Sequence, residues 1–154
     1  MMSLPSEVIR CLTGKTLVTA ESLTGGGIGA VLTSVPGASL VYKGGIISYV
    51  NEVKADVLGV PQEILDRYGA VSCWTAGYMA SGVRKLLKSD IAVSVTGLAG
   101  PGGDEFGHPV GTVYIGYESA SNALVREFHF QGTREEVRNQ TIEAALSLIL
   151  EQNS

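Results

Sequence analysis

The stretch T-L-V-T-A-E-S-L-T-G-G-G-I-G-A, residues 16–30, constrains the fold more than any other part of the chain. Its first residues, 16–19, are apolar or β-branched and predict a short buried strand. A helix is predicted from Thr24 to Leu32, and Ser22 lies between strand and helix, just before three consecutive glycines. Free backbone N–H groups at a helix start favour negative charge. Ser22 is therefore a helix cap, a phosphate ligand or a nucleophile that faces an oxyanion hole, and the stretch alone leaves these three roles open.

The rest of the chain alternates predicted helices and strands. The expected helices are 5–13, 51–58 with Asn51 as its cap, 61–67 with Pro61 as its first residue, one from Ser72 or Thr75 to Leu87, and one of about 16 residues after the capping box Thr133–Glu136. The expected strands are 42–50, 91–96, 110–117 and 124–130, the last two as a hairpin. This order predicts one domain over residues 1–154, a three-layer α/β/α sandwich around a mixed, mostly parallel sheet with a late antiparallel hairpin.

Charge and composition narrow the classes of partner. The net charge of −4 and the lack of a basic run argue against a nucleic-acid partner. No apolar run is long enough for a membrane span, and the N-terminus lacks the pattern of a signal peptide. Cys11 and Cys73 are far apart in the sequence and are expected to be reduced thiols of a cytoplasmic protein. The chain has only two histidines, His108 and His129, so neither a metal site nor a Ser–His–Asp triad is expected.

Three loops follow apolar strands, at residues 20–27, 51–54 and 97–103. Loops at the carboxyl ends of parallel strands converge on one crevice, where ligands bind. The crevice is expected to collect polar side chains together with glycine-rich backbone: Glu21, Ser22, Thr24, Gly25, Gly26, Tyr49, Asn51, Glu52, Lys54, Thr96, Gly97, Gly100 and Gly102.

A serine and a lysine are the reactive pair in this set. An ammonium of ordinary pKa cannot take a proton from serine, but the pKa of a lysine falls in a partly dry pocket, which makes Lys54 a usable base for Ser22. Tyr49 is predicted to orient the amine or relay the proton, and glycine-rich backbone to supply N–H groups to an oxyanion. These parts fit acyl transfer. The alternative from the same residues is a solvated Lys54 on a helix surface.

Five motifs in register carry a resemblance over about residues 6–150: A-E-S-L-T-G-G (20–26), G-G-I-I-S-Y-V-N-E-V-K (44–54), G-A-V-S (69–72), V-T-G-L-A-G-P-G-G (95–103) and P-V-G-T-V (109–113). The chain resembles the C-terminal domain of the competence- and damage-inducible protein CinA, which also occurs alone as nicotinamide-nucleotide amidohydrolase. It departs from the common family pattern at Leu23, His108 and Thr133.

The resemblance implies hydrolysis of nicotinamide mononucleotide to nicotinate mononucleotide and ammonia, without metal or other cofactor, by a homo-oligomer. Carried over by motif, the nucleophile is Ser22, the tyrosine Tyr49 and the lysine Lys54. Arg134 and Arg138 match the arginines that open the family's last helix. Four residues apart, they lie on one helix face and are candidates for the substrate phosphate, as are the glycine-rich loops.

Two other readings use the same residues. Gly25, Gly27 and Ala30 satisfy the G-x-G-x-x-A pattern of dinucleotide-binding oxidoreductases, but residues 21–24 separate the strand from the first glycine, which that fingerprint does not allow. A nucleotide-binding regulatory module, without catalysis, would keep Lys54 protonated as a charge clamp.

Overall fold

The computed structural model describes residues 1–154 and contains one five-stranded sheet with the order β2-β1-β3-β4-β5. The strands are β1 (Leu17–Glu21), β2 (Tyr42–Ile47), β3 (Ile91–Gly97), β4 (Thr112–Ser119) and β5 (Ala123–His129). β1 pairs in parallel with β2 and β3, whereas β4 pairs antiparallel with β3 and β5. Only β4 therefore runs against the others, which confirms the mixed sheet with its late hairpin.

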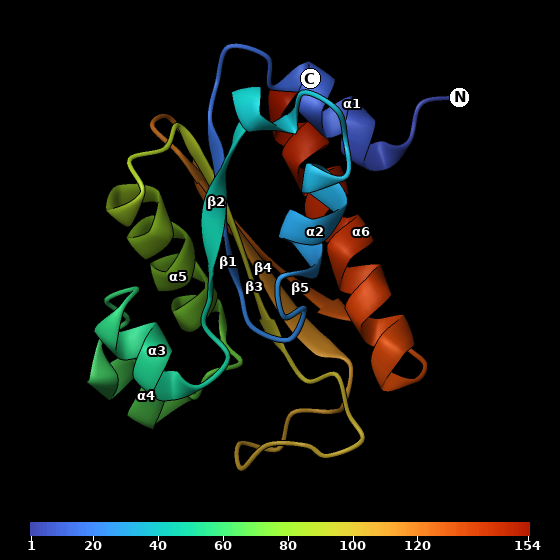
Figure 1. The fold of residues 1–154 in the computed structure, drawn as a ribbon. Coiled ribbons are helices and arrows are strands. Elements are labelled where there is room, and N and C mark those ends of the chain that lie inside the picture. The colour runs from blue at the N-terminus through green and yellow to red at the C-terminus, as the bar shows by residue number, and fades with distance from the viewer.

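Helices cover both faces of this sheet (Figure 1). They are α1 (Leu4–Cys11), α2 (Gly27–Thr33), the 3₁₀ helix η1 (Ala38–Leu40), α3 (Asn51–Asp56), α4 (Gln62–Tyr68), α5 (Cys73–Leu86) and α6 (Arg134–Asn153). α1, α2 and α6 pack on one face, and α5 with α3 and α4 on the other. The alternation of inward side chains along the strands explains the two cores, because adjacent residues of β1, Leu17 and Val18, belong to different apolar clusters.

Three predicted boundaries next to the crevice were wrong. α2 begins at Gly27 rather than Thr24, because Gly25 and Gly26 have φ of +58° and +97°, which a helix cannot contain. β2 ends at Ile47 rather than at residue 50. Asn51 is the first helical residue of α3 and caps nothing with its side chain.

The remaining helix signals have mixed outcomes. Pro61 precedes α4 instead of being its first residue. Ser72, one of the two predicted starts, is the N-cap of α5, since its Oγ accepts from the N–H of Thr75. The capping box of Thr133 and Glu136 is confirmed, and the helix that it opens has 20 residues rather than about 16. No helix of the structure combines the length and apolarity that a bilayer crossing requires.

Candidate active site

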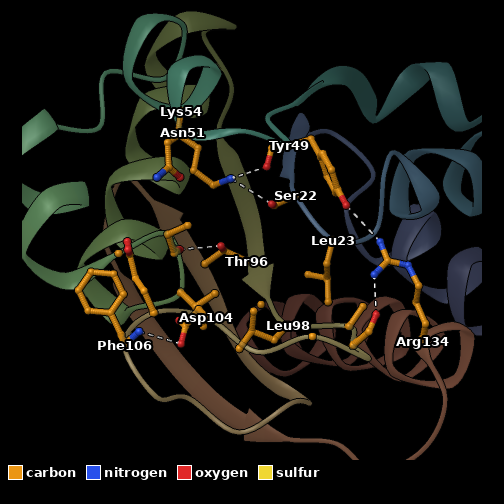
Figure 2. Close-up of a pocket in the computed structure, with 18 of the residues that line it drawn as sticks. Ser22, Leu23, Tyr49, Asn51, Lys54, Thr96, Leu98, Asp104, Phe106 and Arg134 are labelled. Carbon is orange, nitrogen blue, oxygen red and sulfur yellow. Dashed lines mark hydrogen bonds between the residues drawn. The ribbon is translucent and has the colours of Figure 1, made fainter.

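A pocket of about 710 Å³ opens where β1, β2 and β3 end. The last residue of β1, Glu21, pairs with Ile47 and Val95 near the ends of the neighbouring strands, so the three following loops start side by side. The pocket is lined by Ser22, Leu23, Tyr49, Asn51, Lys54, Gly69, Ala70, Val71, residues 96–102 and 104–106, and Arg134. The predicted convergence of the three loops is therefore present in the structure (Figure 2).

Ser22 lies directly after β1, and the neighbouring strand holds its backbone, because its N–H donates to the carbonyl of Val95 at 3.1 Å. Its Oγ accepts from the Nζ of Lys54 at 3.0 Å. No backbone N–H donates to this Oγ, and α2 starts five residues later. The cap interpretation of Ser22 is thus unsupported, and its hydroxyl points to the lysine (Figure 2).

Lys54 is on α3, and only 1% of its surface is exposed. Its Nζ has three acceptors: the Oγ of Ser22, the carbonyl of Ser48 at 2.7 Å and the carbonyl of Tyr49 at 3.2 Å. Burial lowers the pKa of the ammonium from 10.5 to about 8, because a charged amine is disfavoured away from water. The alternative of a solvated lysine is excluded by this burial.

The three acceptors suit both protonation states of Lys54. A protonated ammonium donates to all three of them. A neutral amine has two N–H groups, enough for the carbonyls of Ser48 and Tyr49, and its lone pair is then left toward Ser22 to accept the serine proton. Loss of one proton therefore leaves an amine lone pair toward the Ser22 hydroxyl while the two carbonyl bonds are kept, without any movement of the backbone.

The Tyr49 side chain is not placed as predicted. Its backbone carbonyl contacts Lys54, but its ring is 58% exposed and its hydroxyl accepts from the Nη2 of Arg134 at 3.1 Å (Figure 2). The hydroxyl has no contact with the amine. A proton relay through the phenol has no hydrogen bond to support it, whereas the main chain of Tyr49 orients the amine.

The two arginines at the start of α6 have different surroundings. Arg134 lines the pocket and donates from Nη1 to the carbonyl of Gly100 at 2.7 Å. Arg138 lies outside the pocket and donates from Nε to the carbonyl of Leu23 at 2.9 Å and from Nη2 to that of Thr24 at 3.1 Å. The structure therefore does not bring Arg138 to the substrate position predicted for it.

Five more residues expected in the crevice lie outside the pocket: Glu21, Thr24, Gly25, Gly26 and the exposed Glu52. The carboxylate of Glu21 accepts from the Oγ1 of Thr24 and from two N–H groups of α2, so it faces the helix instead of the cavity. By contrast, Asn51, Thr96, Gly97, Gly100 and Gly102 line the pocket as expected. The hydroxyl of Thr96 donates to the carbonyl of Ala70 at 2.7 Å.

Backbone donors are available beside the nucleophile. The N–H groups of Leu23 and Ala99, two residues that line the pocket, bond to no acceptor of the protein. An N–H on the residue after a nucleophilic serine is a common oxyanion donor. The pocket thus holds a serine hydroxyl, a buried lysine amine and unpaired N–H donors, a combination that fits acyl transfer.

Comparison with known proteins agrees with the resemblance. The family model of the CinA C-terminal domain matches residues 3–153. The chain belongs to the CinA family. A "CinA-like protein" of Thermosynechococcus vestitus is 52% identical over 121 residues, 78% of this chain, and a "Putative competence-damage inducible protein" of Caldicellulosiruptor bescii is 49% identical over 144 residues, 92% of this chain.

Solved CinA-family structures have the same fold. The competence/damage inducible protein CihA of Agrobacterium tumefaciens superposes with a TM-score of 0.94 at 39% identity, covering 98% of this chain and 94% of that one. The competence damage-inducible protein A (ComA) of Klebsiella pneumoniae gives 0.95 at 36% identity, covering 97% and 94%. The chain spans about a third of the length of the curated relatives it matches, 29% and 35% of the two above.

One wall of the pocket in this CinA-family domain was not predicted from the sequence; it is formed by Asp104, Glu105 and Phe106. The Asp104 carboxylate accepts from the N–H groups of Phe106 and His108, and its Oδ2 lies 2.6 Å from the Nδ1 of His108. The signal available in the sequence was the continuation of the glycine-rich loop to Gly107. No group of three or more His, Cys, Asp or Glu side chains is arranged to hold a metal ion.

Proposed function

We propose that this CinA-family domain hydrolyses the carboxamide of nicotinamide mononucleotide to nicotinate mononucleotide and ammonia. The observation that carries the proposal is the buried pair of Ser22 and Lys54, 3.0 Å apart in a pocket of about 710 Å³. A cavity of this size lies within the usual range for small-molecule sites. The family resemblance supplies the substrate, and the serine–lysine pair supplies the chemistry.

The reaction follows from the geometry around the serine. The neutral amine of Lys54 takes the proton of Ser22, and the Oγ attacks the carboxamide carbon. The oxyanion that forms is stabilised by the N–H of Leu23. Lys54 then returns the proton to the departing amide nitrogen, which leaves as ammonia. Water, deprotonated by the same amine, hydrolyses the acyl-enzyme and frees Ser22.

Arg134 is the proposed partner of the substrate phosphate. Its bonds to Gly100 and Tyr49 occupy two of the five guanidinium N–H groups and hold it against the pocket, which leaves three for a ligand. Charged hydrogen bonds of this kind are worth ~1.5–3 kcal/mol. Arg134→Ala should therefore raise the KM for nicotinamide mononucleotide by about 10- to 100-fold and leave the use of nicotinamide riboside unchanged.

The decisive assay is ammonia release from nicotinamide mononucleotide by the purified domain, with nicotinate mononucleotide measured by chromatography. We expect equal amounts of both products. Ser22→Ala should lower the rate by about 10³-fold or more. Ser121→Ala, an exposed serine whose hydroxyl makes no hydrogen bond, is the matched control. Turnover that survives in Ser22→Ala would remove the serine from the mechanism.

A regulatory module that binds nucleotides without catalysis is the second candidate. The three acceptors around Nζ favour this second candidate, since a protonated ammonium can donate to all of them. Its positive charge would then attract the anionic group of a nucleotide. Nucleotide binding by calorimetry, together with no ammonia from the wild-type protein, would support this module. Assembly into a homo-oligomer stays a prediction, which light scattering on the eluted protein tests.

A further inference from the structure

We propose that Arg138 is a positioning residue that holds the backbone around Ser22 in its reactive arrangement. Arg138 makes no contact with the pocket, so it acts through the loop that follows the nucleophile. The inference rests on the proposed function for one of its readouts, turnover, but the reactivity of Ser22 can be measured without that function.

The contacts of Arg138 are bidentate. Nε and Nη2 of one rigid guanidinium donate to two successive carbonyls, those of Leu23 and Thr24, at 2.9 and 3.1 Å. A planar fork with two bonds fixes direction as well as distance, which a lysine cannot do. A Cβ at Gly25 would lie 3.5 Å from Nη2, so the guanidinium packs directly on this backbone.

The loop needs such a holder. Gly25 and Gly26 have positive φ and give the backbone more freedom than any other residue type would. Two internal bonds close the turns of this loop, from the N–H of Gly25 to the carbonyl of Ser22 at 3.1 Å and from the N–H of Gly27 to the carbonyl of Thr24 at 2.9 Å. The carbonyl of Leu23 between them accepts only from Arg138, so that the bonds of the loop and of Arg138 together orient three successive peptide planes after Ser22. The first of these planes carries the unpaired N–H of Leu23, the proposed oxyanion donor.

Arg134, one turn earlier on α6, makes the matching contact on the other side of the pocket, to the carbonyl of Gly100. The first turns of α6 therefore anchor two loops that come from different strands. Arg134 also reaches the cavity, whereas both of the bonds that Arg138 makes are to the protein backbone. This division assigns ligand contact to Arg134 and alignment of Ser22 to Arg138.

The test measures Ser22 itself, with phenylmethanesulfonyl fluoride as the probe. The serine Oγ forms a bond to sulfur, the S–F bond breaks, fluoride leaves and Lys54 takes the proton. Mass spectrometry gives the rate of modification at Ser22. In Arg138→Ala this rate and the kcat for nicotinamide mononucleotide should fall by the same factor, about 10- to 100-fold, while KM changes less than about threefold.

Two further variants and one additive sharpen the result. Guanidinium ion at millimolar concentration should restore part of the labelling rate of Arg138→Ala, and Arg138→Lys should lie between wild type and alanine. Arg126→Ala is the matched control, because Arg126 pairs with Glu151 on an exposed surface of the same molecule and should label like wild type. Melting temperatures show which samples are folded.

Other outcomes overturn the proposal. A raised KM with an unchanged labelling rate would make Arg138 a phosphate ligand. A lower melting temperature, with normal labelling of the folded fraction and no rescue by guanidinium, would make it merely structural. A wild-type Ser22 that labels no faster than Ser121 has no activated hydroxyl to position. If wild-type Ser22 labels rapidly but no ammonia forms, the proposed function fails, and the labelling rates of the variants still decide the role of Arg138.

Discussion

Glu21 and Lys54 are two buried ionisable side chains on either side of the Ser22 loop, with exposed fractions of 2% and 1%. Every hydrogen bond to the Glu21 carboxylate comes from the surrounding frame: the Oγ1 atoms of Thr19 and Thr24 and the N–H groups of Ile28 and Gly29, at 2.7 to 3.2 Å. Glu21 therefore fastens the start of α2 to the end of β1.

Lys54 makes as full a set of hydrogen bonds, but one of its partners is the hydroxyl of Ser22 and its side chain lines the cavity. Burial and hydrogen bonding are thus the same for the two side chains, and neither property separates structure from chemistry. Lys54 differs from Glu21 in two properties: it contacts the hydroxyl of Ser22, and it lines the pocket. Five predictions test this contrast, in order of decreasing expected change in free energy.

The largest effect is expected for Lys54→Met, which keeps an unbranched chain in the same space but removes the amine. The loss of the base should lower kcat by about 10³-fold or more, about 4 kcal/mol of activation free energy. The melting temperature should change by only a few degrees, because the relief of removing a buried charge is offset by the loss of a donor to the carbonyls of Ser48 and Tyr49. The assay is ammonia release beside thermal unfolding. An active methionine variant would show that Lys54, like Glu21, has only a structural role.

The next largest effect is expected for Glu21→Gln, and it should appear in stability. The amide NH₂ cannot accept, so at least one of the buried donors of Thr24, Ile28 or Gly29 loses its partner. The free energy of unfolding in urea should fall by about 2–3 kcal/mol. Glu63→Gln, an exposed residue of α4, should change little. A catalytic defect without loss of stability would contradict the assignment of Glu21 to the frame.

Much of the fold and the central pair could be predicted from the sequence. Apolar runs gave the strands, and the rule that loops meet at the carboxyl ends of parallel strands brought Ser22, Lys54 and Thr96 into one pocket, where the structure has them. The helix start at Thr133 followed from its capping box, which depends on residues three positions apart, whereas the start of α5 was left open between Ser72 and Thr75. These inferences succeed because the helix start depends on local spacing and the pocket on a general rule of sheet topology, and neither depends on the direction of a single side chain.

The errors within the site, apart from the wrong element boundaries, concern the direction of side chains, which spacing does not specify. Glu21 and Ser22 are neighbours, but along an extended chain they point to opposite sides, one to α2 and one to the pocket. Arg134 and Arg138 share a helix face, but they are one helical turn apart. Arg134 therefore reaches the cavity, whereas Arg138 reaches the loop after Ser22. Phe106 reaches the pocket from a loop with no periodic pattern to read.

The pH dependence should also separate Lys54 from the frame. The proposed base is the neutral amine, so kcat/KM should rise about tenfold per pH unit below the pKa of about 8 and level off above it. Initial rates between pH 6.5 and 9, with substrate well below KM, measure this curve. A flat profile would indicate that Lys54 acts only as a fixed charge.

The free energy of unfolding should also depend on pH, because burial lowers the pKa of Lys54 in the folded domain. The folded pKa of Lys54, about 8, lies below the ordinary value of 10.5, so between these values the unfolded chain holds a proton that the folded domain has released. The unfolding free energy should therefore rise with pH in this window, by at most about 1.4 kcal/mol per pH unit, and show no such slope below it. Lys54→Met, measured by urea unfolding at the same pH values, should lack the slope.

The smallest effect is expected for Tyr49→Phe. The phenol contacts Arg134 and not Lys54, and its ring is exposed, while the Tyr49 carbonyl that holds the amine is unchanged by the substitution. The variant should lose less than about tenfold in kcat/KM, below about 1.4 kcal/mol, mostly in KM because Arg134 is less firmly held. Steady-state kinetics at pH 8 decide this. A loss of more than about 100-fold, confined to kcat, would show that the hydroxyl moves to the amine during turnover and relays its proton.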